Sequence, residues 1–183
     1  MRRAALNEVL VSLVPAEIPD SHRAIAYEAD RIHESALYSA QGQFEQAKLW
    51  RLINLLFGVP AAALAAVSGG TALAGKLGVW SGVMALLSAA FSATLTTVNA
   101  SRRMTQAQSS ANAYLQLQTA ARQFLAVDLV GMSHEDAREL LRNLTNSRDE
   151  LNKTADPPGR LAYRRSVKNI NRGGQTYAAD EKD

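Results

Sequence analysis

The feature that most constrains the fold of this chain is a long stretch without acidic residues. Glu45 and Asp128 are separated by 82 positions that hold no Asp or Glu. Six basic residues lie in this stretch: Lys48, Arg51, Lys76, Arg102, Arg103 and Arg122. Because a charged side chain is costly both in lipid and in a protein core, this distribution indicates a large apolar environment.

Two uninterrupted charge-free runs lie inside this stretch. Residues 52–75 make a run of 24 positions, and residues 77–101 make a second run of 25. Each run is long enough to cross a hydrocarbon layer of about 30 Å as a helix, at about 1.5 Å per residue. The segment "SGGTALAGK", residues 68–76, contains three glycines and is typical of a turn. We therefore expect a helical hairpin over residues 52–101, with spans at about 52–73 and 78–99.

The rest of the chain also reads as helical, because no period-two alternation persists anywhere. Apolar positions recur at helical spacing in both flanking regions, and Ser133 with Asp136 three residues later is typical of a capping box. The predicted fold class is all-α, a two-helix transmembrane hairpin with long cytoplasmic helical extensions. The predicted segments are an N-terminal segment 1–20, a helix 21–51 leading into the membrane, the hairpin 52–101, helices within 102–155, a short basic helix 156–172 and a disordered tail 173–183.

Three patterns favour a membrane over a soluble core. Basic residues flank the hairpin at Lys48, Arg51, Arg102 and Arg103, which predicts a cytoplasmic interface there and both termini in the cytoplasm. Trp50 and Trp80 lie near run ends, as interfacial aromatic rings do. Small residues recur every four positions, a spacing that lets helices approach closely in lipid. The predicted helix-packing residues are Gly58, Ala62, Ala66 and Gly70 in the first run and Gly78 and Gly82 in the second.

The energetics of insertion leave an alternative open. The first run has only about seven or eight large apolar side chains, each contributing roughly −0.3 to −0.6 kcal/mol to insertion. Asn54, Pro60 and the glycines oppose insertion. A soluble helical scaffold whose hairpin is buried by oligomerisation remains an alternative, as does a hairpin that inserts only when triggered.

Hydroxyl groups form a stripe in the second run. The candidate pore-lining residues, spaced seven, four, four and three positions apart, are Ser81, Ser88, Ser92, Thr96 and Asn99. In an oligomer such a face would line a water-filled path without fixed charge. Equally, hydroxyls bond back to their own helix or join neighbouring helices.

No constellation of residues indicates catalysis, so we predict that the chain is not an enzyme and needs no cofactor or metal. The sequence has no cysteine, and its three histidines are scattered. Gly70, Gly75 and Lys76 have phosphate-loop spacing, but Leu77 stands where that motif needs Ser or Thr. The basic residues from Arg160 to Arg172 suit anionic lipid, a phosphorylated ligand or plain solvent exposure, and no direct nucleic-acid binding is predicted.

The layout resembles the SLATT family, whose name denotes SMODS- and SLOG-associating two-transmembrane effectors. The resemblance covers roughly residues 30–172 and rests on "YSAQGQFEQAKLWR", the small-residue apolar hairpin, "VNASRRMTQAQSSANAYLQLQTAARQF" and "ADPPGRLAYRRSVKNI".

The resemblance implies a homo-oligomeric effector in the bacterial inner membrane. Such an effector forms pores or disrupts the membrane in antiphage defence by abortive infection. It implies a separately encoded sensor, a nucleotidyltransferase or a reverse transcriptase as partner, with membrane lipid as the other contact. A membrane anchor that recruits a partner enzyme without conducting is a further alternative.

Overall fold

A computed structural model describes residues 13–15, 18–75 and 78–174, and every regular element in these ranges is helical. The elements are α1 (Asp20–Leu73), α2 (Val79–Val98), α3 (Ala100–Gln123), a π-helical turn η1 (Phe124–Asp128), a 3-10 turn η2 (Leu129–Gly131), α4 (His134–Thr154) and α5 (Arg160–Ile170). The prediction of an all-α chain is confirmed for these ranges. The predicted N-terminal segment up to residue 12, and the predicted tail beyond residue 174, lie outside the described residues.

The chain divides into two compact units. Unit 1 comprises residues 1–46 and 107–183, and unit 2 comprises residues 47–106. Helix α1 supplies its first half to unit 1 and its second half to unit 2.

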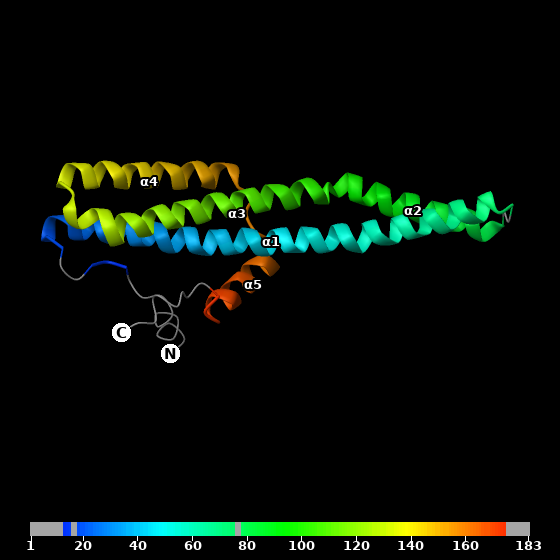
Figure 1. Cartoon of the computed structure of the whole chain (residues 1–183), viewed down its shortest axis with the longest axis horizontal. Helices are drawn as coiled ribbons and strands as arrows, with labels where there is room; N and C mark the ends of the chain where they lie inside the picture. The colour runs from blue at the N-terminus through cyan, green and yellow to red at the C-terminus, as the bar shows by residue number, and fades with distance from the viewer. Residues whose placement is uncertain (1–12, 16–17, 76–77, 175–183) are drawn as a thin grey trace. The chain divides into compact units, whose positions relative to one another are not determined.

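In unit 1 the helices α1, α3 and α4 lie side by side (Figure 1), and their apolar stripes form a shared core. Small and branched residues of α1 alternate along its buried face, which allows α3 and α4 to approach closely. The shared core includes Ile25, Ala29, Ile32 and Ala36 from α1, Leu117 and Ala121 from α3, Phe124, Leu125 and Leu129 from the two turns, and Ala137 and Leu144 from α4. The sequence pattern predicts the core positions in α1 and α4 and Ala121, Leu125 and Leu129, whereas Leu117 and Phe124 were not predicted.

The π-helical turn was not predicted from the sequence. A π-helical turn widens the spacing of the backbone, so it shifts which side chains face inward. Here it keeps Phe124, Leu125 and Leu129 almost fully buried, at 1% or less exposed, while Val127 between them is 71% exposed. The turn thus holds the end of α3 against the core just before the chain reverses into α4.

The start of α4 is fixed by Ser133, which the sequence predicts as the N-cap, with Asp136 as its partner. The Ser133 hydroxyl oxygen accepts a hydrogen bond from the Asp136 backbone N–H at 3.2 Å, and it donates to the Asp136 carboxylate at 2.7 Å. Glu135 and Asp136 also place negative charge in the first turn, where the helix dipole favours it. Further along, the Tyr114 hydroxyl of α3 donates to the side-chain oxygen of Asn152 in α4, and burial raises the pKa of Tyr114.

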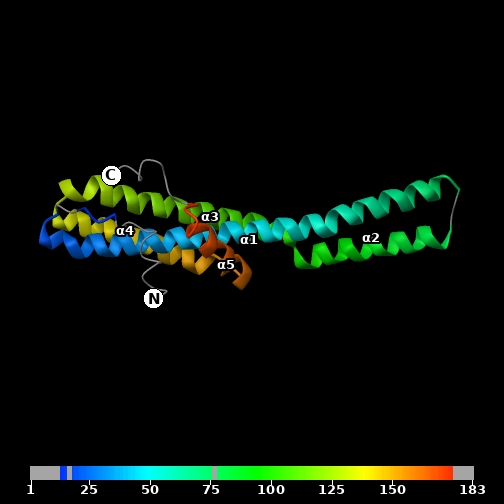
Figure 2. The same ribbon diagram turned by 90° about the horizontal axis from the view of Figure 1, so that it is seen from below.

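Unit 2 is an antiparallel pair of helices, residues 47–73 of α1 and residues 79–98 of α2, called here the helix pair (Figure 2). Two glycines make the connection. Gly75 adopts φ +70°, a conformation that only glycine reaches without cost, and Gly78 caps α2 from an extended conformation.

Asn99 separates α2 from α3. It adopts a left-handed conformation with φ 53°, and its N–H donates to the Leu95 carbonyl. Asparagine tolerates this region better than other side chains that carry a Cβ. The second apolar helix therefore ends at Val98, close to the predicted end of the span at 99.

The role of the π-helical turn can be tested with two neighbouring substitutions. Phe124→Ala should lower the free energy of unfolding by about 3–5 kcal/mol, because it empties a fully buried site. Val127→Ala, in the same turn, is the matched control and should change it by less than about 0.5 kcal/mol. Urea unfolding in mild detergent, followed by circular dichroism, measures both values. Equal effects of the two substitutions would contradict the assignment.

Candidate functional site

The surface of the helix pair is the most unusual feature of the described chain. Among the residues that the structure describes, sixteen large hydrophobic residues are exposed, and eleven of them lie from Leu52 to Leu87. The eleven are Leu52, Leu55, Leu56, Val59, Val67, Leu73, Val79, Trp80, Val83, Leu86 and Leu87. Soluble monomers rarely expose contiguous apolar patches larger than a few hundred Å².

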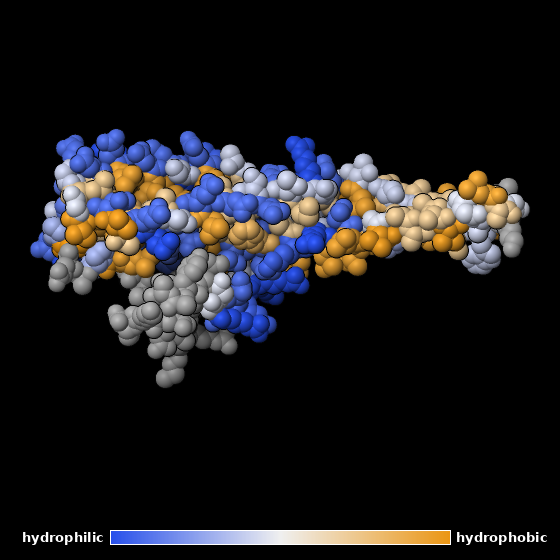
Figure 3. Space-filling model, in the orientation of Figure 1, coloured by the Kyte–Doolittle hydropathy of each residue, from blue (hydrophilic) through white to orange (hydrophobic). Residues whose placement is uncertain are grey.

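Both apolar stretches pass the length and composition test for a membrane span. Within the described residues two helices pass it, and only 6% of the apolar window of each is buried. The core helix of a soluble protein can pass the same test, but its window is then mostly buried. Figure 3 shows apolar colours with pale, weakly polar residues between them over the helix pair, whereas strongly hydrophilic colours are frequent over unit 1.

Contacts inside the pair lie along one narrow seam. Phe57 and Phe91 meet edge to face, with ring centroids 5.7 Å apart. The Ser88 hydroxyl donates to the Ala61 carbonyl at 2.7 Å, and both residues are buried. Nearer the turn, the Ser68 hydroxyl donates to the Ser81 carbonyl at 2.9 Å. Contact positions that rise along α1 while they fall along α2 show that the two helices are antiparallel.

At the end of the helix pair opposite the turn, called here the open end, an aromatic ring contacts a cation. The guanidinium of Arg103 lies 5.3 Å from the centroid of the Trp50 ring. Cation–π attraction at such a distance is worth about 0.5–2 kcal/mol. This contact joins Trp50, just before the first apolar run, to Arg103, just after the second.

The structure therefore brings part of the predicted cationic interface together. Lys48, Arg51, Arg102 and Arg103 are all exposed and lie at this end of the two helices. The sequence indicated that Trp50 would be interfacial but did not reveal Arg103 as its partner. Lys76, the one predicted charge at the opposite end, lies outside the described residues.

The candidate pore-lining set is divided by the structure. Ser81 and Ser88 lie on the side of α2 that faces α1, and Ser92 and Thr96 lie on its exposed side. Asn99 is at the helix junction, outside α2. The Ser81 hydroxyl donates to the carbonyl of Gly78, the N-cap of α2, and the Thr96 hydroxyl donates to the Ser92 carbonyl of the same helix. Pore lining by Ser92 and Thr96 stays a prediction, and it requires further copies of the chain.

Of the six predicted packing residues, one lies at the seam between α1 and α2 and five lie away from it. A Cβ added at Gly58 would lie 3.5 Å from Leu95 Cδ1, so Gly58 is at the seam. Ala62 and Ala66 are exposed, and the spaces at Gly70, Gly78 and Gly82 are open to at least 4 Å. These five residues take no part in the seam between α1 and α2. Packing through them between copies stays a prediction.

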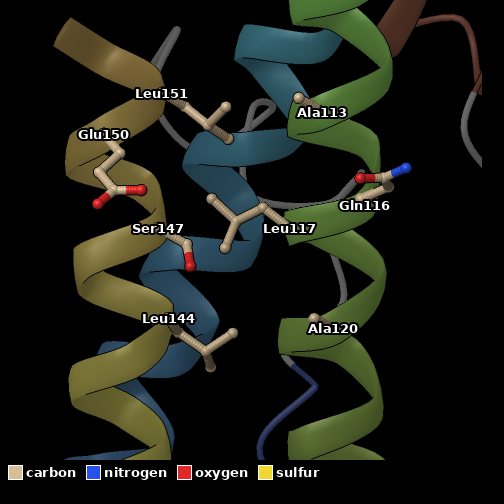
Figure 4. A pocket seen from close by; sticks show the side chains of 8 residues that line it. All are labelled: Ala113, Gln116, Leu117, Ala120, Leu144, Ser147, Glu150 and Leu151. Atoms are coloured by element: carbon tan, nitrogen blue, oxygen red, sulfur yellow. The ribbon is translucent and has the colours of Figure 1, made fainter.

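A groove is present among the described residues of unit 1. It lies between α3 and α4, with a volume of about 330 Å³. Leu144 and Leu151 of α4 point toward Leu117 of α3, and Glu150 is the one titratable residue in the lining (Figure 4). The groove therefore offers an apolar contact surface and lacks a pair of groups for proton transfer.

The histidines are less scattered in space than in sequence. The rings of His22 and His134 meet edge to face, with centroids 5.6 Å apart. His33 lies 3.5 Å from the Gln118 side-chain nitrogen, and burial, opposed by Asp30 and aided by Arg122, lowers the pKa of His33. Within the described ranges no three His, Asp or Glu side chains are grouped to hold a metal ion.

Comparison of the chain with protein-family models, with curated proteins and with solved structures found no match.

The seam can be tested with two serines four residues apart. Ser88→Leu places a larger side chain against Ala61 and removes a hydrogen bond, so it should destabilise the pair by about 1–3 kcal/mol. Ser92→Leu, on the exposed side, is the control and should have little effect. Both tryptophans lie in unit 2, so their fluorescence during titration of mild detergent with SDS reports on this unit. An unchanged midpoint for Ser88→Leu would show that the seam lies elsewhere.

Proposed function

We propose that this protein is an integral membrane effector that permeabilises the bacterial inner membrane in antiphage defence. Its helix pair would span the bilayer, and its termini would lie in the cytoplasm. A separately encoded sensor, nucleotidyltransferase or reverse transcriptase would trigger it. The resulting loss of the membrane gradient would stop growth of the infected cell.

The single observation that supports membrane insertion is the exposed apolar surface of the helix pair. Both windows are long enough to span, and almost none of either window is covered by the rest of the chain. Hydrocarbon covers such a surface without cost, whereas water does not. The hydrogen bond from Ser88 to Ala61 also satisfies a hydroxyl that lipid could not.

The charges at the open end support an orientation of the helix pair in which this end and both termini lie on the cytoplasmic side of the membrane. The residues Lys48, Arg51, Arg102 and Arg103 exceed the single Lys76 at the turn, and positive charge favours the cytoplasmic side. The contact between Arg103 and Trp50 places an aromatic ring and a cation where headgroups would lie.

The step from insertion to permeabilisation rests on the resemblance to SLATT effectors. A single pair offers no polar path, because Ser81 and Ser88 face α1 and bond within the pair. Several copies would have to assemble, with Ser92 and Thr96 facing water between them. The open glycines at 78 and 82 would allow neighbouring copies to approach closely.

A non-conducting membrane anchor is the second candidate function. The inward-facing hydroxyls favour it, since a pair that satisfies its own polar groups can simply span the bilayer. The apolar groove between α3 and α4 would then receive the recruited partner.

Membrane potential distinguishes the effector from the anchor. Induced expression in bacteria should stop growth and discharge a potential-sensitive dye if the chain permeabilises the membrane. Gly78→Leu combined with Gly82→Leu should abolish both effects without abolishing expression. Among the described residues, no atom beyond the local backbone lies within 4 Å of a Cβ added at either site, so the leucines would disturb contacts between copies.

Gly69→Leu is the matched control, because its surroundings are equally open and it lies outside the predicted ladders. It should leave toxicity intact. Undiminished killing by the double variant would contradict the packing role. Growth arrest with an intact potential would select the anchor.

A further inference from the structure

Three hydrogen bonds join helix α5 and the residues before it to one short segment of α1, residues 41–46. The Gln43 side chain donates to the Asp156 carbonyl at 2.6 Å, and the Gly159 N–H donates to the Gln46 side chain at 2.9 Å. The Asn169 side chain donates to Gln41 at 3.1 Å. In both ribbon views α5 lies beside α1 (Figures 1 and 2). These contacts hold both ends of α5.

Close packing strengthens this attachment. A Cβ at Gly42 would lie 3.1 Å from Pro158 Cγ, so the absence of a side chain lets the segment before α5 approach α1. The face of α5 turned inward consists of Ala162, Ser166 and Ile170, each 2% exposed or less. Burial, the Glu34 carboxylate and Tyr163 of α5 together raise the pKa of Tyr38 in α1. Helix α5 is thus a fixed part of unit 1.

The outward face of α5 carries cations that form no ion pair within the described part of the chain. Residues 157–179 contain no acid. The five exposed cations of α5 and the turn after it are Arg160, Arg164, Arg165, Lys168 and Arg172. The hydrophilic colour of this region is visible on unit 1 in Figure 3.

Two large exposed side chains accompany these cations: Leu161 lies on the cationic face of α5, and Tyr163 lies at its edge, toward Tyr38 of α1. Leu161 is 53% exposed and Tyr163 is 58% exposed. A helix that mixes basic residues with exposed leucine and aromatic rings is typical of a membrane surface, where the rings enter the headgroup boundary and the cations meet phosphates. Solvation by water alone does not explain why two large side chains are exposed on this helix.

The attachment point lies near the start of the apolar run. Gln46 precedes Leu52 by six residues of the same helix, a rise of about 9 Å. The headgroup layer on each side of a bilayer is about 5–7 Å thick, and electrostatic screening extends about 8 Å at physiological salt. Gln41 lies five positions before Gln46, so the three α1 side chains that hydrogen-bond the segment 156–169 lie six to eleven residues before Leu52 along the same helix.

We propose that α5 is a surface anchor that binds anionic phospholipid headgroups through Arg160, Arg164 and Arg165. This inference rests on the proposed insertion of the helix pair, and it assigns a lipid class to the same membrane. Binding at α5 fixes the level of unit 1 at the bilayer surface and makes the position of α1 sensitive to membrane charge.

A single fluorescent label tests this proposal in the full-length protein. The chain has no cysteine, so Leu161→Cys gives one attachment site for a polarity-sensitive dye. The labelled protein is reconstituted into vesicles of phosphatidylcholine alone or mixed with phosphatidylglycerol. The dye emission should rise severalfold and shift to the blue only with phosphatidylglycerol. The rise should disappear at 1 M salt, where the screening length is about 3 Å.

Two variants that each remove three positive charges distinguish binding at α5 from an effect of the net charge of the protein. Arg160→Gln, Arg164→Gln and Arg165→Gln together should reduce the emission to the phosphatidylcholine level. The control replaces three exposed cations of α4 by glutamine, Arg138, Arg142 and Lys153, and should leave the response intact.

Equal emission in the two vesicle types, or a normal response of the α5 variant, would overturn the proposal. So would an equal response to free glycerol phosphate without vesicles, which would assign the cations to a soluble ligand. Flotation with vesicles of phosphatidylcholine alone reports the insertion of the helix pair separately. Failure of flotation would contradict the proposed function, whereas failure of the dye response alone would contradict only the role of α5.

Discussion

Removal of apolar surface from water is the constraint on which this structure depends, and the two halves of α1 meet it differently. The first half is covered by α3 and α4, so that Ile25, Ala29 and Ile32 are almost completely buried. The second half has α2 as its neighbour and leaves most of its apolar side chains exposed. A pair of helices cannot enclose a core, so the second half requires a different solvent or other copies of the chain. The proposed membrane location follows from this difference.

The sequence predicted the elements well and their facing directions poorly. Most of the apolar stripe positions of unit 1 and the Ser133 cap lie where the sequence pattern indicated, and helices cover most of both charge-free runs. The predicted ladders used steps of four, and each such step rotates the position by about 40° around a helix. A ladder from residue 58 to residue 70 therefore turns away from its starting face. The observed seam mixes steps of three and four, and only Gly58 of the predicted set belongs to it.

Other features were hidden because they depend on tertiary contact. The π-helical turn at Phe124 and the left-handed Asn99 have no distinctive local pattern, and the pairing of Arg103 with Trp50 joins residues far apart in the chain. Likewise, composition indicated a basic segment after residue 159, but only the contacts with Gln41, Gln43 and Gln46 show that it is fixed to α1. The functional consequence is that the proposed conduction requires several copies of the chain, because the hydroxyls of a single pair are largely satisfied within it.

The most direct test of the central claim is whether the full-length chain, expressed in bacteria, stays in the membrane after a wash with carbonate at high pH. Peripheral proteins are released by this wash, whereas inserted helices remain and float with the lipid on a density gradient. Our account predicts retention and flotation, because residues 52–98 would lie in hydrocarbon. Release into the supernatant would contradict it and would indicate that the apolar surface is buried between soluble copies.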